Sequence, residues 1–299
     1  MAAPEAPKVS IGLPVFNGEP FLTGALDALL AQSFTDYELI ICDNASSDGT
    51  AAICRELASR DRRVRYIRHA ENIGVTRNFN RVFELSRAPY FHWAAADDLC
   101  APELLQRLVA VLDARPEVAL CYSRTREIDA DGRTLREYSD GLHVEQPEPH
   151  RRYAACLWNI HMCNPNFGLY RATALRMTGL EGNYSNSDIV MLCAASLHGA
   201  MVEIPEVLFY RRVHAGMTVQ RHPDAHDRMR LANPSAGRQL TFPGFLFFAG
   251  FVTSISRSGL PLAERLRCYA RLHIAWRRWR GRLWDDLRHV WRYLFAGPI

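Results

Sequence analysis

The chain has 299 residues, of which 48% are hydrophobic and 23% are charged. This is enough material for a large buried core, and the composition excludes a low-complexity chain. No run reaches the roughly 20 apolar residues that a membrane-spanning helix needs, and the N-terminal residues MAAPEAPK lack the apolar segment of a signal peptide. We therefore expect a cytoplasmic protein.

The formal net charge is +4, and it is unevenly distributed. Residues 261–299 contain nine arginines and only three acidic residues, so the basic character belongs to the C-terminal end. The eight cysteines are scattered through apolar segments without a CxxC pair or a Cys/His cluster. This pattern predicts buried, reduced thiols rather than a metal site or a disulfide framework.

Strand and helix patterns alternate over the first 125 residues. The predicted strands are residues 9–13, 37–42, 64–68, 90–94 and 118–122, and the predicted helices are residues 20–32, 48–59, 75–86 and 102–114. This alternation predicts a parallel sheet with helices on both faces. Ligands of such sheets bind beyond the carboxyl ends of the strands, so the segments that follow the strands are the place to look for a site.

The second half of the chain is less regular. Residues 124–150 are polar and rich in turn formers, with Asp131-Gly132 as a predicted hairpin turn. Helices are expected near residues 152–159, 171–178 and 187–198, and strands near 167–170 and 201–210. We expect residues 222–240 to form a mobile loop and the last 60 residues to be helical.

Polar segments follow each of the first four predicted strands. They read PVFNGE, DNASSDGT and ENIGVTRN, and the fourth is the pair Asp97-Asp98. Each one alone could be a turn or a helix cap, but four at one edge of a sheet favour a binding site. None matches GxGxxG or GxxxxGK[ST], which weighs against a dinucleotide-dependent oxidoreductase and a P-loop enzyme.

Carboxylates and amides dominate this predicted edge. They are Asp43, Asn44, Asn72, Asn78, Asp97 and Asp98. Carboxylates that lie beside a diphosphate need a cation between them, and hard oxygen ligands favour Mg²⁺ or Mn²⁺. The alternative for Asp97 and Asp98 is capping of the helix that begins near Pro102, but a cap needs only one carboxylate.

These motifs carry a family resemblance. The stretch VSIGLPVFNGEPFLTGALDALLAQSFTDYELIICDNASSDGT, followed by ENIGVTRNFN and AADD, resembles the nucleotide-sugar half of family-2 glycosyltransferases with the GT-A fold. The stretch NSDIVMLCAASLHGAMVEIPEVLFYRRVHAGMT is similar to the acceptor half. The resemblance covers roughly residues 8–218.

The resemblance implies an α/β fold with a Rossmann-like, mostly parallel sheet flanked by helices. Residues 1–218 would form the glycosyltransferase domain, divided into a nucleotide-sugar half (8–125) and an acceptor half (126–218). Residues 219–299 would be a C-terminal loop and an amphipathic helical extension.

The resemblance also implies site residues. Contacts to the nucleotide sugar would come from Pro14, Val15, Phe16, Asn17, Glu19, Asp43, Asn44, Asn72, Gly74, Arg77, Ala96 and Asp97. Asp43 would accept a hydrogen bond from the ring N–H of the base. Asp97 and Asp98 correspond to the DxD-type motif, and His214 to a histidine that faces the metal or the diphosphate. Ala95 stands where many members carry a further acid, so the assignment of ribose and metal between Asp97 and Asp98 stays open.

Asp188 matches the position of the catalytic base, although it could also be an acid favoured by a helix N-terminus. A single base opposite a departing nucleoside diphosphate implies direct displacement with inversion. The expected donor is a UDP, dTDP or GDP sugar, and the expected acceptor is the hydroxyl of a glycan or a lipid-linked acceptor. The alternative function is a non-catalytic protein that binds a nucleotide sugar on the same fold.

The C-terminal residues form an apolar stripe at helical spacing, with arginines on the other faces. The stripe includes Leu262, Leu266, Trp276, Leu287 and Leu294. We expect peripheral contact with anionic lipid at the cytoplasmic face of a membrane. The alternatives are packing on the rest of the chain or on a second copy in a homodimer. No nucleic-acid partner is expected, because no RNA- or DNA-binding motif accompanies the basic residues.

Overall fold

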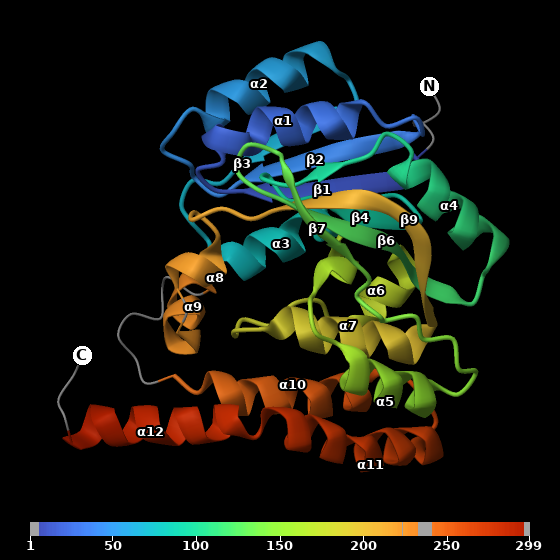
Figure 1. Ribbon diagram of the computed structural model, residues 1–299, viewed down its shortest axis with the longest axis vertical. Helices are drawn as coiled ribbons and strands as arrows, with labels where there is room; N and C mark the ends of the chain where they lie inside the picture. Colours follow the sequence, from blue (N-terminus) through green and yellow to red (C-terminus); the bar gives the residue numbers. More distant parts are fainter. Residues whose placement is uncertain (1–5, 223, 233–240, 296–299) are drawn as a thin grey trace.

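The structure is a computed structural model that describes residues 6–222, 224–232 and 241–295 (Figure 1). The strands are β1 (Val9–Val15), β2 (Tyr37–Asp43), β3 (Val64–Arg68), β4 (Tyr90–Trp93), β5 (Leu99–Cys100), β6 (Val118–Ile128), β7 (Thr134–Tyr138), β8 (Leu169–Arg171) and β9 (Ala200–Arg212). The helices are α1 (Glu19–Leu30), α2 (Thr50–Arg60), α3 (Val75–Glu84), α4 (Leu104–Ala114), α5 (Pro149–Asn159), α6 (Ala172–Thr178), α7 (Ser187–His198), α8 (Thr218–Arg221), α9 (Ala225–Ala232), α10 (Pro243–Arg257), α11 (Leu262–Trp279) and α12 (Gly281–Phe295), with a short 3₁₀ turn, η1, at Asn164–Phe167.

The strands form one sheet in the order β3-β2-β1-β4-β8-β6-β9-β5, and β7 pairs with β6. Strands β1 to β4 are parallel, as the alternation of strands and helices predicts. The other half is mixed, because β8 runs antiparallel to β4 and β6 while β6 and β9 are parallel. A parallel pair needs a long crossover connection, whereas β6 and β7 are joined by the short turn at Gly132, whose φ of 86° suits glycine.

Each face of the sheet has its own apolar core, because successive residues of a strand point to opposite faces. On β2, Leu39 and Ile41 belong to the core on the side of α1 and α4, and Ile40 and Cys42 belong to the core on the opposite side. Helices α1 and α2 lie above the sheet in Figure 1, and α3, α6 and α7 lie below it. Both faces are therefore buried, as expected.

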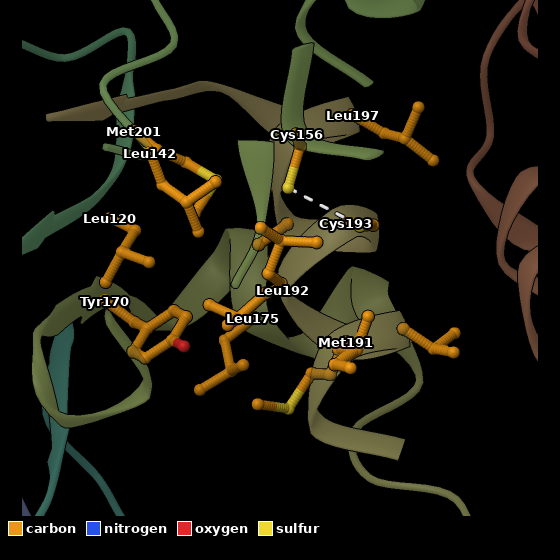
Figure 2. Packing of buried hydrophobic residues seen from close by; sticks show 14 of the residues in the cluster. Leu120, Leu142, Cys156, Tyr170, Leu175, Met191, Leu192, Cys193, Leu197 and Met201 are labelled. Carbon is orange, nitrogen blue, oxygen red and sulfur yellow. Dashed lines mark hydrogen bonds between the residues drawn. The ribbon is translucent and has the colours of Figure 1, made fainter. Parts of the chain in front are cut away.

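The lower core extends through α7 to the C-terminal helices. Figure 2 shows sheet residues such as Leu120, Tyr170 and Met201 packed near Leu175 and Leu192 of the helices. In the same core the Sγ atoms of Cys156 and Cys193 lie 3.4 Å apart. All eight cysteines are free, and most are buried, which agrees with the predicted thiols.

Helices α10, α11 and α12 confirm the helical character expected of the C-terminal residues. Phe247 and Phe251 of α10 and Ile274 of α11 belong to the same core as Leu120, so α10 and α11 share a core with the sheet. The division at residue 218 stays a prediction. In the described residues no helix is long and apolar enough to cross a membrane.

Two expectations for local structure need correction, and one short strand was not predicted. The segment predicted as a loop contains helix α9, whose start is stabilised by the Asp224 carboxylate accepting a hydrogen bond from the His226 N–H. Residues 223 and 233–240 of that prediction lie outside the described residues. Strands β6 and β9 extend further than expected, to Ile128 and Arg212, because they pair with each other along most of their length. The two-residue strand β5 has no period in the sequence that could have predicted it.

Candidate active site

A cavity of about 680 Å³ opens at the carboxyl ends of β1, β2 and β4, where the sequence predicts the site. We call it the donor cavity. Nine of the predicted site residues line it: Pro14, Val15, Phe16, Asn17, Asn44, Asn72, Ala96, Asp97 and His214. Glu19, Asp43, Gly74, Arg77, Asp98 and Asp188 are predicted site residues that do not line it.

The loop after β1 is held by the loop after β2. The Asn17 backbone is left-handed, with a φ of 52°, and its N–H donates to Ser46 Oγ over 2.9 Å. The N–H of Gly18 donates to Thr50 Oγ1 over 2.9 Å. Glu19 turns away from the donor cavity and accepts a hydrogen bond from the Gly49 N–H over 2.8 Å. The side chain of Glu19 therefore joins two loops in this structure.

Asp43 lies beneath the donor cavity and is fully buried. Its carboxylate accepts hydrogen bonds from the Ser46 N–H at 2.8 Å and from the Tyr66 hydroxyl at 2.7 Å. The neighbouring Asn44 lines the cavity, and its Nδ2 donates to Asn72 Oδ1 over 2.9 Å. The amide of Asn44 therefore reaches the cavity, while Asp43 orients the loop that carries it.

Asn72 lines the donor cavity, and Gly74 holds its side chain from outside the lining. Asn72 Oδ1 also accepts a hydrogen bond from the Gly74 N–H over 2.9 Å. Gly74 has a φ of 89°, which favours glycine at this position, just before α3 begins. Arg77 is exposed on α3 and lies outside the cavity lining.

Asp97 and Asp98 have different neighbours. The Asp97 carboxylate lines the donor cavity, with 35% of its side chain exposed, and Oδ2 lies 2.9 Å from His214 Nε2. The Asp98 carboxylate accepts a hydrogen bond from the Arg212 N–H over 2.8 Å. Burial, followed by the adjacent Asp97 charge, raises the pKa of Asp98 well above its usual range. Asp97 is thus the acid of the pair that faces the cavity.

Residues at and just after the end of β9 form hydrogen bonds with Asp97 and Asp98. The Arg212 side chain donates from Nε to the Asp97 carbonyl and from Nη1 to the carbonyls of Asp129 and Ala130. The His214 Nδ1 accepts a hydrogen bond from the Gly216 N–H over 3.1 Å. In a neutral His214 the proton therefore sits on Nε2, from which it is donated to Asp97.

The donor cavity has part of the ligand set that a divalent cation needs. In the described residues, no three His, Cys, Asp or Glu side chains are grouped closely enough to hold a metal. The cavity does offer one carboxylate, Asp97, beside one imidazole, His214. Mg²⁺ is commonly held by one or two carboxylates together with water and substrate phosphates, so Asp97 fits such an ion, and His214 would join it only as the other tautomer, with the proton moved from Nε2 to Nδ1.

Asp188 lies at the N-terminal end of α7 and outside the donor cavity lining. Its Oδ1 accepts a hydrogen bond from the Ile189 N–H over 3.0 Å. Burial, followed by the charge of Asp188, raises the pKa of Glu181 to about 8. Glu181 is a neighbour of the predicted base that the sequence did not single out, because the two residues come together only through the turn before α7.

Apolar and basic residues complete the donor cavity. Phe21 and Phe79 line it, together with Arg221 of α8. The Phe21 ring lies 4.5 Å from the His214 ring and beneath the Arg212 guanidinium. In the sequence, Phe21 belongs to the apolar face of a predicted helix. The helical spacing of that face predicts that Phe21 packs in the core, so the sequence did not indicate that it lines the donor cavity.

Comparison with known proteins identifies the family. The family model described as glycosyl transferase family 2 matches residues 10–178, which is more than half of the chain. The chain is 26% identical to chondroitin synthase of Escherichia coli over 237 residues. That match covers 78% of this chain but only 33% of the relative, so the chain spans about a third of that protein's length.

Solved structures share the fold. Residues 1–349 of TarS from S. aureus in complex with UDP align with a TM-score of 0.64 at 16% identity, covering 92% of this chain and 73% of that one. A mannosyltransferase from Pyrobaculum calidifontis, PcManGT, in complex with GDP-Man and Mn²⁺ aligns with a TM-score of 0.52 at 15% identity, covering 98% and 88%. The sheet and its flanking helices therefore form a GT-A fold with C-terminal helices, and the chain belongs to glycosyl transferase family 2.

Proposed function

We propose that this chain transfers a sugar from a nucleoside-diphosphate sugar to an acceptor hydroxyl, in the assembly of a glycan, cell wall or surface polysaccharide. The observation that carries the proposal is the donor cavity at the carboxyl ends of the parallel strands, with Asp97 and His214 on its wall. Membership of family 2 supports the same reaction class.

The nucleotide is proposed to be UDP, dTDP or GDP. The neighbouring folds are known with UDP, with UDP-GlcNAc and with GDP-Man. Asn44 and Asn72 face the cavity and can bond the nucleoside, and Asp43 supports them from below. Amide side chains both donate and accept hydrogen bonds, so they can pair with uracil, thymine or guanine.

Asp97 and His214 are proposed to hold Mg²⁺ or Mn²⁺ together with the diphosphate. When bound, such an ion supplies Lewis-acid stabilisation of the charge that develops on the departing nucleoside diphosphate. Asp98, fastened to the Arg212 N–H, is proposed to fix the position of Asp97. PcManGT, whose structure contains Mn²⁺, supports the choice of ion.

Asp188 is proposed to take the proton of the acceptor hydroxyl. One base opposite the leaving group gives direct displacement and inversion at the anomeric carbon. A second function, binding of a nucleotide sugar without transfer, is favoured by one observation: Asp188 does not line the donor cavity.

The C-terminal helices are proposed to contact anionic lipid at the cytoplasmic face of a membrane, with a glycan or lipid-linked acceptor. Trp284 and Trp291 of α12 are 60% and 63% exposed beside exposed arginines, a pattern typical of interfacial helices. Pairing of these helices with a second copy, giving a homodimer, is the competing use.

The proposal is tested by thermal denaturation of the full chain with UDP, GDP or dTDP, each with and without Mn²⁺, followed by an assay of donor hydrolysis and transfer. We expect one nucleotide to stabilise the chain in the presence of Mn²⁺. Asp97→Asn should weaken that binding about 100-fold, because it removes the carboxylate that faces the cavity. Asp36→Asn, an exposed acid at the start of β2, is the matched control. Stabilisation without turnover on any donor would favour the non-catalytic function, and no stabilisation by any nucleotide would overturn both.

A further inference from the structure

A second cavity, of about 390 Å³, lies where α9 and the N-terminal ends of α7 and α10 meet α12. It shares no lining residue with the donor cavity. Its wall includes Arg228, Arg282 and Arg288, together with His226 and His289, whose rings stack 3.8 Å apart. Five side chains that carry or can gain positive charge therefore line one small space, together with the three aspartates Asp224, Asp285 and Asp286.

Among the described residues, Arg282 has no directly paired carboxylate. Its Nη1 donates to Asn186 Oδ1 over 3.0 Å, and its guanidinium lies 4.3 Å from the centre of the Phe247 ring. Within the described part of the chain, no carboxylate oxygen lies within 4.0 Å of its guanidinium. Arg282 is also partly buried, and burying a cation costs free energy that a directly hydrogen-bonded anion offsets.

The acids in the wall of the second cavity have other partners. The Asp286 carboxylate accepts hydrogen bonds from the N–H groups of Gly244 and Phe245. Asp285 pairs with Arg288 over 3.2 Å. Asp224 accepts a hydrogen bond from the His226 N–H. These bonds direct the three carboxylates to groups other than Arg282.

Two guanidiniums converge on the turn that precedes α7. Arg228 Nε donates to Ser185 Oγ over 3.1 Å, and Arg282 donates to the next residue, Asn186. The first turn of α7 follows directly and contains Asp188, whose charge acts favourably on Arg282. The N-terminal end of α7 also carries the partial positive charge of the helix dipole, which favours an anion.

We propose that the second cavity binds a phosphate group carried by the acceptor, and so holds the acceptor on the same turn as Asp188. This inference rests on the proposed function, because it assigns the substrate class of the same reaction. Arginine suits the role because its planar guanidinium can donate two parallel hydrogen bonds to a phosphate. A phosphate here would give Arg282 a directly hydrogen-bonded anion, which it does not have among the described residues.

The test is titration calorimetry of the full chain with inorganic phosphate, in EDTA and at constant ionic strength, so that the donor cavity has no divalent metal. We expect Arg282→Gln to weaken phosphate binding about tenfold or more, by loss of charge-assisted hydrogen bonds. Arg282→Lys keeps the positive charge but loses the planar pair of donors, so its affinity for phosphate should lie between that of the parent and that of Arg282→Gln. The control is Arg257→Gln, an exposed arginine at the other end of α10, about 20 Å along the helix from Gly244.

Two competitors then identify the carrier of the phosphate. Glycerophosphoglycerol represents a polymer with phosphodiester links, and dodecyl phosphate in neutral micelles represents a lipid-linked phosphate. Displacement of phosphate by either one, weakened by Arg282→Gln, supports the proposal. Equal phosphate affinity in the parent and in Arg282→Gln, no phosphate binding at all, or binding of inorganic phosphate with neither ester, would overturn it. The titration needs neither donor nor turnover, so its result is independent of the test of the proposed function.

Discussion

At the scale of single residues, the two acids at the end of β4 are no longer equivalent. Their sequence neighbours give no way to tell them apart, but their partners do. Asp97 faces the donor cavity beside His214, and Asp98 is bonded to the backbone of Arg212. The pair is therefore divided between one acid available to a ligand and one acid that holds the segment in place.

Asp188→Asn tests the proposed base. The amide cannot accept the proton of the acceptor hydroxyl, so transfer should fall by about 10² to 10⁴-fold. Binding of the nucleotide should stay as in the parent, because Asp188 lies outside the donor cavity. Initial rates of transfer and nucleotide titrations of the folded variant give the two numbers. Transfer close to that of the parent would remove Asp188 from the mechanism.

Asp140 predicts a pH dependence of stability. It is 5% exposed, and its Oδ1 has no hydrogen-bond partner in the described part of the chain. Burial raises the pKa of Asp140 to about 7, and the nearby Glu203 adds to this while Asn164 and Arg211 oppose it. Since the pKa in the unfolded chain is about 3.9, the folded state keeps a proton that the unfolded state loses, and the free energy of unfolding falls as the pH rises from about 4 to 7.

In Asp140→Asn this loss should disappear. Urea denaturation at several pH values should show the variant gaining on the parent by on the order of a few kcal/mol between pH 4 and pH 8. Other groups titrate in both proteins and cancel in the difference. Parallel stability curves for the two proteins would contradict the prediction.

At the scale of elements, the sequence predicts what local periodicity determines. The five alternating strands, the helices between them and the hairpin turn at Gly132 all follow from patterns within a few residues. The ends of β6 and β9 could not be predicted, because their extension depends on pairing between segments about 80 residues apart. The hydrogen-bond partners of Asp43 and Glu19 could not be predicted either, because hydrogen bonds within and between loops leave no periodic pattern in the sequence.

The start of α10 depends on a side chain from another helix. The Asp286 carboxylate of α12 is 1% exposed and bonds the N–H groups of Gly244 and Phe245, in place of a cap from within α10. Asp286→Ala should therefore lower the free energy of unfolding by about 1–3 kcal/mol. The adjacent Asp285→Ala removes only an exposed pair with Arg288 and should change it by less than about 0.5 kcal/mol. Chemical denaturation measures both, and equal effects would show that Asp286 does not cap α10.

At the scale of the whole molecule, exposed apolar side chains gather on the C-terminal helices. Most of the large exposed apolar residues of the described chain lie there: Phe245, Leu246, Val252, Leu262, Leu266, Trp276, Trp284, Leu287, Trp291, Leu294 and Phe295. Helices α11 and α12 lie at the edge of the molecule opposite α1 and α2 (Figure 1). On α11, Cys268, Ile274 and Ala275 are buried against the rest of the chain, whereas Leu262, Leu266 and Trp276 are exposed. The apolar stripe that the sequence predicts is therefore only partly covered.

Vesicle co-sedimentation tests the lipid proposal. The full chain should bind vesicles that contain anionic lipid at low salt, and binding should weaken as salt is added. Leu287→Ala combined with Leu294→Ala should reduce binding about tenfold, through loss of apolar area. Leu135→Ala, an equally exposed leucine on β7, is the control. If the chain is a dimer in solution and does not bind anionic vesicles, the result would support pairing of two copies instead.

The route of the chain after β4 has a consequence for communication across the molecule. Residues 94–98 leave the parallel half of the sheet, and β5 pairs with β9 at the far edge, through Leu99 with Tyr210 and Cys100 with Phe209. The segment that carries Asp97, residues 94–98, therefore connects the two halves of the sheet and is anchored in both by β4 and β5; we call it the strap. By linkage, a ligand that favours the anchored strap stabilises the pairing of β5 with β9, and a substitution that loosens this distant pairing lowers the affinity for the ligand by the same free energy. Donor affinity should thus report on the integrity of an edge of the sheet that the donor never touches.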